Sequence, residues 1–366
     1  MRKILLNITL TSLCSLAFGQ VPNGYYDSAT GDGFELKTQL YHIIKNHTTK
    51  TYANLWGLYT GNPSAFNDNW YDSTDTNKIM DIYSEKPQGQ DAYTFIPGTN
   101  QCGGSGGNEG TCYNREHLIP QSVFNQNSPM VSDPFHIWPT DYQVNNRRAN
   151  YPFGVVKNPT WTSTNGSKLG PNNNSGYSEG YSGVVFEPID EFKGDIARAY
   201  FYFATRYQEN GIQNWNYPMF NGTKDLVFTT TFLKILMNWH TNDPVSPREI
   251  ALNNTIYTFQ NNRNPFIDYP EYAQKIWGYN LSNSDFEHQE RNEINVYKSG
   301  PNTISVISNN DNKIIEIHIF NINGQFINKI ANVKLNNKVD ISLNNKGTYI
   351  FKIIGKSMEI NKKVVL

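Results

Sequence analysis

The first candidate for chemistry in this sequence is a carboxylate directly beside an imidazole, at Glu116 and His117. A histidine near its ordinary pKa of about 6.5 is largely neutral at neutral pH and can accept a proton from water. Neighbouring side chains of a strand point to opposite faces, so both can reach one substrate only at a strand end or twist. The pair alone is weak evidence, because a second one occurs at Glu287 and His288.

A polar segment farther along the chain supplies partners for this pair. The strand-like stretch 136–138 leads into residues 144–154, where Asn145, Arg148 and Asn150 do not fit a buried face. Asn145 and Arg148 are three residues apart and are therefore neighbours if this segment is helical. The pattern predicts two strands followed by a short helix.

This arrangement suits phosphodiester cleavage with one hard cation. The side-chain oxygens of Glu116 and Asn145 are suitable ligands for Mg²⁺, which would hold the scissile phosphate and the leaving oxygen. His117 would activate the attacking water, and a nearby arginine would pair with phosphate through its planar guanidinium.

The elements that must position these residues belong to a helix-rich body from Tyr25 to about Gly278. Helical periodicity occurs at residues 36–45, 193–209 and 231–240. Two segments rich in Gly, Asn, Ser and Pro, residues 97–110 and 158–183, are predicted to be loops.

Short alternating runs replace this pattern after about Glu293. They are separated by Asn-Gly and Asn-Asn-Lys-Gly turns and predict a small β-sandwich of roughly 75 residues. The expected fold class is therefore α+β: a helix-rich body around a two-strand-and-helix core, followed by a small C-terminal β-sandwich.

The start of the chain has the pattern of a signal peptide over residues 1–19. Early cations precede an apolar run that ends in small residues, and the run is shorter than the roughly 20 apolar residues of a membrane span. We therefore expect cleavage before Gln20 and no membrane span in the mature form. Cys14 is then removed, so Cys102 and Cys112 are expected to form a disulfide, with two free thiols as the alternative.

The net charge of −1 conceals an asymmetry between the two parts of the chain. Residues 294–366 contain ten Lys and four acidic residues, whereas the preceding part contains 21 cations and 28 acids. An acidic body argues against tight, non-specific duplex binding by a basic groove. Phosphate contacts must then come from a metal ion and a few arginines.

The body resembles the endonuclease I family of periplasmic and secreted nucleases, which belongs to the ββα-metal group. The residues that carry this resemblance are Asp81–Ser84, Cys112–His117, Pro139–Asp141, Val144–Gly154, Phe186–Pro188, Lys193–Arg198, Trp239–Ser246 and Asn262–Asp268. The chain departs from the family at two points: it has Asp133-Pro134-Phe135 where Asp-Leu-His is common, and Asn146 where Gly is common.

The resemblance implies a role for each matched position. The general base falls on His117 and the metal ligands on Glu116 and Asn145, with Mg²⁺ as the cofactor and Mn²⁺ or Ca²⁺ as alternatives. It also implies a monomer that acts on DNA, and on RNA as a second substrate, and leaves 5′-phosphate ends. The expected contacts to substrate or phosphate are Arg115, His136, Arg148, Asn150 and Arg198. A scaffolding role is the alternative for Arg148 and Asn150, and it is the expected role of the 193–209 helix, with Arg198 as the exception.

The C-terminal part resembles the sorting domain of proteins exported by the type IX secretion system, on Ile319–Gln325, Val339–Ile341, Lys346–Ile350 and Lys362–Leu366. This implies the secretion machinery as a partner, and a secreted or cell-surface location. The expected domains are residues 1–19, signal peptide; 20–285, nuclease; and 286–366, sorting domain.

Three other functions are alternatives. A metalloprotease would need a His-Glu-x-x-His motif, which is absent from the sequence. A carbohydrate-directed protein would need a carboxylate pair that the sequence does not identify. A catalytically inactive protein on the same scaffold is the third alternative.

Overall fold

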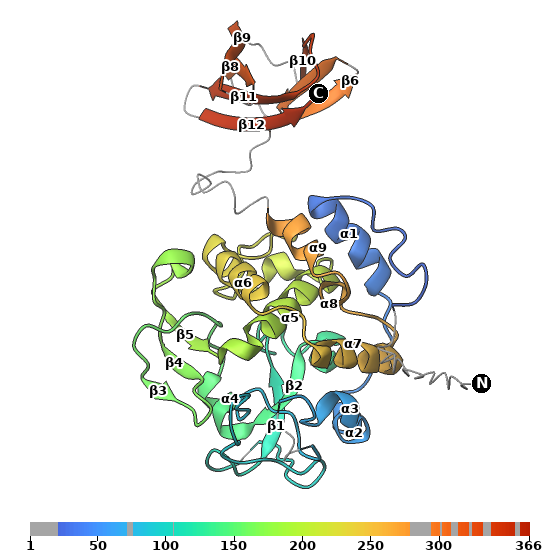
Figure 1. Cartoon of the computed structure of the whole chain (residues 1–366), viewed down its shortest axis with the longest axis vertical. Coiled ribbons are helices and arrows are strands. Elements are labelled where there is room, and N and C mark those ends of the chain that lie inside the picture. The colour runs from blue at the N-terminus through green and yellow to red at the C-terminus, as the bar shows by residue number, and fades with distance from the viewer. Residues whose placement is uncertain are drawn as a thin grey trace, which may run out of the picture. The chain divides into compact units, whose positions relative to one another are not determined.

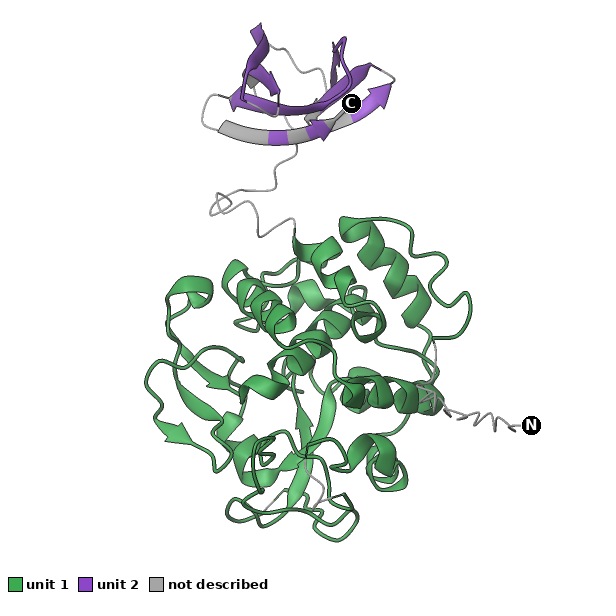
Figure 2. Ribbon diagram, viewed as in Figure 1, with its two compact units in different colours: residues 1–283 green, residues 284–366 purple. Residues whose placement is uncertain are grey.

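The computed structural model describes residues 21–71, 76–104, 106–278, 294–300, 302–308, 314–321, 324–331, 338–355 and 359–366. The predicted signal peptide lies outside these residues. The chain divides into two compact units, residues 1–283 and 284–366, which are described separately (Figure 2). No helix in the described part of the chain is long and apolar enough to cross a membrane.

The first unit is helix-rich, and its described residues form two small sheets (Figure 1). Its helices are α1 (Gly33–Ile44), α2 (Asn54–Gly61), α3 (Pro63–Phe66), α4 (Tyr142–Arg148), α5 (Lys193–Arg206), α6 (Thr230–Asn242), α7 (Pro247–Gln260), α8 (Pro265–Asp268) and α9 (Glu271–Ala273). Shorter helical turns are η1 (Met130–Ser132), η2 (Gly176–Ser178), η3 (Asp190–Phe192), η4 (Ile212–Asn214) and the π-helical η5 (Gln274–Gly278).

Helix α5 is the centre of this unit (Figure 1). Every residue of α5 after Lys193 is buried, and the helix packs against α1, α6 and α8. Its aromatic side chains, which include Tyr200, Phe201 and Phe203, belong to the main hydrophobic core. Burial of these large apolar surfaces is the main stabilising contribution to this part of the fold.

The predicted core of two strands and a helix is present. Strand β1 (Tyr113–His117) pairs antiparallel with β2 (Ile137–Asp141), and α4 follows β2 directly. Asp141 caps α4, because its Oδ1 accepts a hydrogen bond from the Val144 backbone N–H at 2.8 Å.

The segment 158–183, predicted to be a loop, contains two short strands. Strands β3 (Trp161–Thr162) and β4 (Lys168–Pro171) form an antiparallel sheet with β5 (Val184–Glu187). The Gly- and Asn-rich sequence hides these strands, since their pairing depends on β5, which lies farther along the chain.

The second unit is the predicted β-sandwich. One sheet has the order β10-β7-β6 and the other β12-β11-β8-β9. Its strands are β6 (Ile294–Gly300), β7 (Thr303–Ser308), β8 (Ile314–Asn321), β9 (Phe326–Ala331), β10 (Lys338–Ser342), β11 (Thr348–Gly355) and β12 (Glu359–Val365). Both sheets contribute to one core, for example through Val306 and Phe351. The α+β prediction is thus confirmed.

Candidate active site

The side chains of β1 divide between two environments. Asn114 and Glu116 contact α4, through Asn145 and Arg148. Arg115 and His117 lie instead against Tyr52, which precedes α2. This division follows from the alternation of side chains along a strand.

Glu116 is a buried carboxylate with two polar partners. It is 1% exposed, and its Oε1 accepts a hydrogen bond from the Tyr83 hydroxyl at 2.8 Å and lies 3.3 Å from Nη1 of Arg148. Burial raises the pKa of Glu116 to about 7, while Arg148 and the Tyr83 hydroxyl act in the opposite direction. A positive ion at this carboxylate would offset the cost of its desolvation.

Asn145 approaches the same face of β1 from α4. Its Nδ2 donates a hydrogen bond to Oδ1 of Asn114 at 2.8 Å. This bond occupies the amide nitrogen and leaves the side-chain oxygen as the group available to a ligand.

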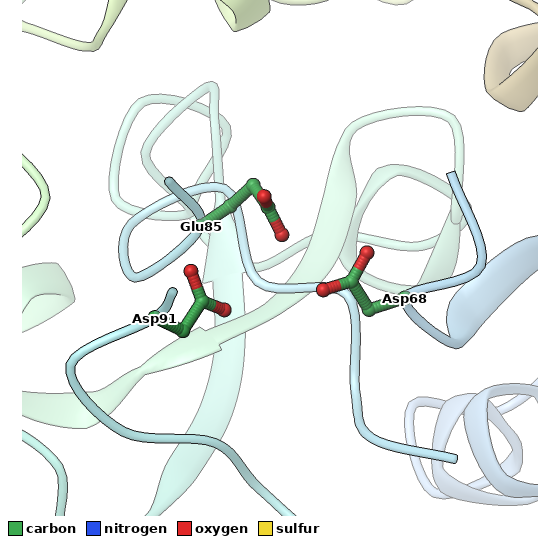
Figure 3. Close-up of side chains that lie close together, drawn as sticks. All are labelled: Asp68, Glu85 and Asp91. Carbon is green, nitrogen blue, oxygen red and sulfur yellow. The ribbon is translucent and has the colours of Figure 1, made fainter. Parts of the chain in front are cut away.

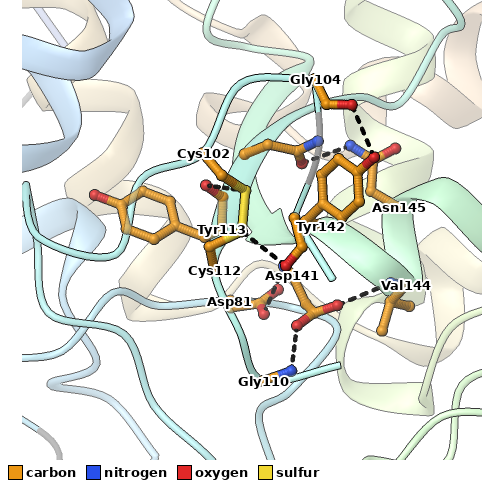
Figure 4. The surroundings of a disulfide bond; sticks show 12 residues. Asp81, Cys102, Gly104, Gly110, Cys112, Tyr113, Asp141, Tyr142, Val144 and Asn145 are labelled. Atoms are coloured by element: carbon orange, nitrogen blue, oxygen red, sulfur yellow. Dashed lines mark hydrogen bonds between the residues drawn. A yellow bond between two sulfur atoms is a disulfide. The ribbon is translucent and has the colours of Figure 1, made fainter. Parts of the chain in front are cut away.

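The start of α4 is held by its neighbours (Figure 4). Oδ2 of Asp141 accepts a hydrogen bond from the Gly110 N–H at 2.7 Å, and Oδ2 of Asp81 accepts one from the Asp141 N–H at 2.9 Å. The predicted Cys102–Cys112 disulfide is confirmed and closes the loop that contains Gly110. The disulfide loop and the helix that carries Asn145 are therefore joined directly.

The residues present fit a hard divalent cation. Glu116 and Asn145 would contribute carboxylate and amide oxygens, the kind of ligand that suits Mg²⁺, Mn²⁺ and Ca²⁺. Arg148, which contacts Glu116, comes three residues after Asn145 in α4, so the side chains of Asn145 and Arg148 are neighbours on the helix.

His117 is oriented by a backbone carbonyl. Its Nε2 lies 3.4 Å from the Val131 carbonyl oxygen, so Nε2–H donates and Nδ1 is left as the acceptor. Burial, and then the nearby His136, lower the pKa of His117 to about 3, so the imidazole is neutral at physiological pH. A neutral imidazole with an acceptor nitrogen is the form that a general base requires.

Arg148 has structural contacts on several sides. Its side chain is 1% exposed, and its guanidinium donates to the backbone carbonyl oxygens of His117 and Leu118 in addition to its contact with Glu116. This geometry favours the scaffolding alternative. Arg115, by contrast, is half-buried, and Asn150 is exposed two residues after the end of α4.

His136 and Arg198 lie in buried networks. His136 is 0% exposed, and its Nε2 is 2.9 Å from the Met130 carbonyl oxygen. Arg198, in α5, pairs with Asp195 of the same helix and with Glu249 of α7. The polar groups of both side chains are therefore engaged inside the protein.

Sequence reasoning missed three contributors to the site: Tyr52, Tyr83 and the Val131 carbonyl. Tyr83 lies in the Asp81–Ser84 motif, which was the only available signal for it. Tyr52 lies far from β1 in the sequence and carries no local signal. The Val131 carbonyl is a backbone group, so residue types do not indicate it.

A second group of oxygen atoms lies in the same unit (Figure 3). Side-chain oxygens of Asp68, Glu85 and Asp91 lie within 4.8 Å of one another, and Asp68 and Glu85 are buried. Such a group could hold a cation, but acidic clusters also occur without one. It contains none of the residues predicted from the sequence.

Comparison with known proteins gives two family matches. The family model described as Endonuclease I matches residues 32–271, and the model described as Secretion system C-terminal sorting domain matches residues 299–366. Both resemblances found in the sequence are thereby confirmed.

Two curated relatives cover most of the first unit. An extracellular ribonuclease of Bacillus amyloliquefaciens is 32% identical over 258 residues, 69% of this chain and 78% of the relative. An extracellular ribonuclease of Bacillus subtilis (strain 168) is 32% identical over 275 residues, 73% of this chain and 84% of the relative.

Proposed function

Since this chain belongs to the endonuclease I family and is a secreted nuclease, we propose that it hydrolyses phosphodiester bonds of DNA, and of RNA as a second substrate, with a divalent cation. The observation that carries this proposal is the attachment of α4, which holds Asn145, to the end of β1, which holds Glu116 and His117, through the Arg148–Glu116 and Asn145–Asn114 contacts. The names of the two relatives support RNA as a substrate.

His117 is proposed as the general base. Its Nδ1 would take the proton from the attacking water, while the Val131 carbonyl oxygen holds Nε2–H. The negative phosphate of a bound substrate would raise the pKa of His117 from its low value and so strengthen the base.

Glu116 and Asn145 are proposed as the ligands of the cation, with Mg²⁺ as the expected ion. When bound there, the cation would neutralise charge on the scissile phosphate and on the leaving 3′-oxygen. Departure of the 3′-oxygen leaves the phosphate on the 5′ side of the next nucleotide. Arg115 is proposed to contact phosphate.

Little sequence preference is expected. The proposed contacts are made to the sugar–phosphate backbone, which is the same whatever the base sequence. The acidic body also makes the cation and local arginines the main source of affinity.

The proposed domains follow the compact units and the matched ranges. We assign residues 20–285 to the nuclease domain and 286–366 to the sorting domain, after a signal peptide over residues 1–19. The unit boundary after residue 283 and the matches to 32–271 and 299–366 support this division.

The test compares plasmid DNA and single-stranded RNA as substrates of the purified secreted protein, in Mg²⁺ and in EDTA. We expect cleavage in Mg²⁺ and none in EDTA. His117→Ala should lower the cleavage rate at least about 10²-fold. His42→Ala, at an exposed position of α1, is the matched control and should cleave normally.

Failure of the wild type to cut either substrate in Mg²⁺, Mn²⁺ or Ca²⁺ would overturn the proposal and favour an inactive protein on this scaffold. The ends of the products are tested by labelling with polynucleotide kinase. We expect labelling only after the fragments have been treated with phosphatase.

A further inference from the structure

Arg115 contacts two aromatic rings on the His117 face of β1. Its guanidinium carbon is 3.5 Å from the centre of the Tyr52 ring and 4.4 Å from the centre of the Trp56 ring. Its Nη1 also donates a hydrogen bond to the Tyr52 carbonyl oxygen at 2.7 Å. The guanidinium is therefore held in one place before any ligand arrives.

The two rings contact three successive side chains on this face of the strand. Trp56 packs edge-on against Tyr113, with ring centres 5.7 Å apart, and Tyr52 lies against the His117 ring at 5.5 Å. Tyr113, Arg115 and His117 are spaced two residues apart, which is roughly 7 Å for each step along a strand. This spacing is on the scale of one nucleotide step in an extended strand of nucleic acid.

Within the described residues, Arg115 forms no salt bridge. In this it differs from Arg148, Arg198 and Arg263, each of which is paired with a buried carboxylate. A half-buried cation without a carboxylate partner can pair with an anion from outside the protein. A guanidinium stacked on aromatic rings keeps its planar edge for phosphate oxygens, which an ammonium group cannot do.

Tyr52 and His117 are held by two chain segments that are bonded to each other. The Ser132 hydroxyl donates to the Lys50 carbonyl oxygen at 2.6 Å and so ties the segment before Tyr52 to the turn that contains Val131. The Val131 carbonyl is the group that orients His117. Arg115 and His117 are thus positioned by the same pair of segments.

We propose that Tyr52 and Trp56 form an aromatic clamp that holds Arg115 as a subsite for the phosphate adjacent to the scissile one. This inference rests on the proposed nuclease function and specifies its substrate: a strand with at least two successive phosphates. Arg115 contacts that second phosphate, and Tyr52 and Trp56 are positioning residues. Pre-orientation lowers the entropy that binding would otherwise lose.

The experiment uses three thymidine dinucleotides as competitors against cleavage of a fluorescent DNA strand by the full secreted protein. TpT contains one phosphate, while pTpT and TpTp add a second phosphate on the 5′ or the 3′ side. We expect the inhibition constant to fall at least about tenfold from TpT to the better of the other two, as for a charge-assisted hydrogen bond.

Variants then test whether Arg115 and the ring of Tyr52 cause this gain in inhibition. Arg115→Ala should reduce it to less than about threefold, and Arg115→Lys should restore little of it, because lysine lacks the planar stack. Tyr52→Phe keeps the ring and should keep the gain, whereas Tyr52→Leu should lose most of it. Arg147→Ala removes an exposed cation of α4 that stacks on Trp161 and should leave the gain intact.

The outcomes separate this proposal from the function on which it rests. If the wild type cuts the DNA strand in Mg²⁺ but gains nothing from a second phosphate, or if no dinucleotide inhibits at millimolar concentration, the subsite is refuted. The same holds if Arg115→Ala keeps the full gain. If the DNA strand is not cut with any cation, the nuclease function itself fails.

Discussion

Arg148 and Glu116 form a buried ion pair between α4 and β1, with 3.3 Å between Nη1 and Oε1 and both side chains almost fully enclosed. The same guanidinium donates to the His117 carbonyl oxygen at 2.8 Å. One side chain therefore fixes a proposed metal ligand and the backbone of the proposed base. Helix α4 is joined to the end of β1 by charge as well as by packing.

The first prediction concerns this pair. Arg148→Met should destabilise the fold by about 3–5 kcal/mol, because it leaves the buried Glu116 carboxylate without its cation. Arg148→Lys keeps the charge but cannot reach both carbonyl oxygens and the carboxylate. Its stability should therefore lie between those of wild type and Arg148→Met. Urea unfolding measures the effect, and Arg147→Met on the exposed side of α4 is the control. A difference between Arg148→Met and wild type of less than about 1 kcal/mol would contradict this role.

The second prediction compares two neighbouring asparagines of α4. Asn145→Ala should raise the Mg²⁺ concentration needed for half-maximal cleavage at least about tenfold, because it removes a proposed oxygen ligand. Asn146→Ala, at the adjacent exposed position, should leave that concentration unchanged. Titration of activity with Mg²⁺ makes the measurement. Equal metal dependence of the two variants would remove Asn145 from the metal site.

The sequence predicted those parts of the site that depend on local pattern. The three-residue spacing of Asn145 and Arg148 placed them on one face of a helix, and both contact β1. The alternation of side chains along a strand predicted that Glu116 and His117 lie on opposite faces of β1, and the structure shows this. Local sequence pattern was sufficient to predict β1, β2 and α4, because these three elements lie within a short stretch of chain.

Burial and distant contacts could not be predicted in this way. Arg198 has the residue type of a phosphate contact, but its guanidinium pairs with Glu249, which comes 51 residues later. Tyr83 and Tyr52 reach β1 from segments whose place depends on the packing of the whole unit. Residue type shows what a side chain can do, whereas tertiary packing decides which partners it meets.

The third prediction concerns the disulfide. Cys102 and Cys112 should resist alkylation in the native secreted protein, as measured by intact mass under non-reducing conditions. Replacing both with Ser should lower the free energy of unfolding by roughly 3 kcal/mol, because the unfolded chain regains the freedom of the open loop. Two alkylated thiols in native material would show that the bond does not form.

The fourth prediction is a pH dependence of stability that arises at Lys37 of α1. This lysine is 0% exposed, and its Nζ donates to Oε1 of Gln208 at 3.1 Å and to the Lys224 carbonyl oxygen at 2.6 Å. Burial lowers the pKa of Lys37 from 10.5 to about 7. The charges of Asp225 and Glu209 act in the opposite direction, and that of Lys224 reinforces the effect of burial.

The sign of the effect follows from proton binding. Between about pH 7 and pH 10.5 the unfolded chain holds a proton on Lys37 that the folded chain has released. The wild type therefore gains stability as pH rises through this window, and below it the folded state carries the full cost of a buried charge.

Lys37→Met removes this dependence. The variant should be more stable than wild type near neutral pH, and its advantage should shrink by up to roughly 4 kcal/mol as pH rises toward 10. Urea unfolding of both proteins at several pH values gives the difference in their free energies of unfolding. The contributions of titrating groups that both proteins contain cancel in this difference. Lys157→Met, at an exposed position, is the control and should show no such trend. A difference between Lys37→Met and wild type that does not change with pH would show that Lys37 keeps its ordinary protonation in the folded protein.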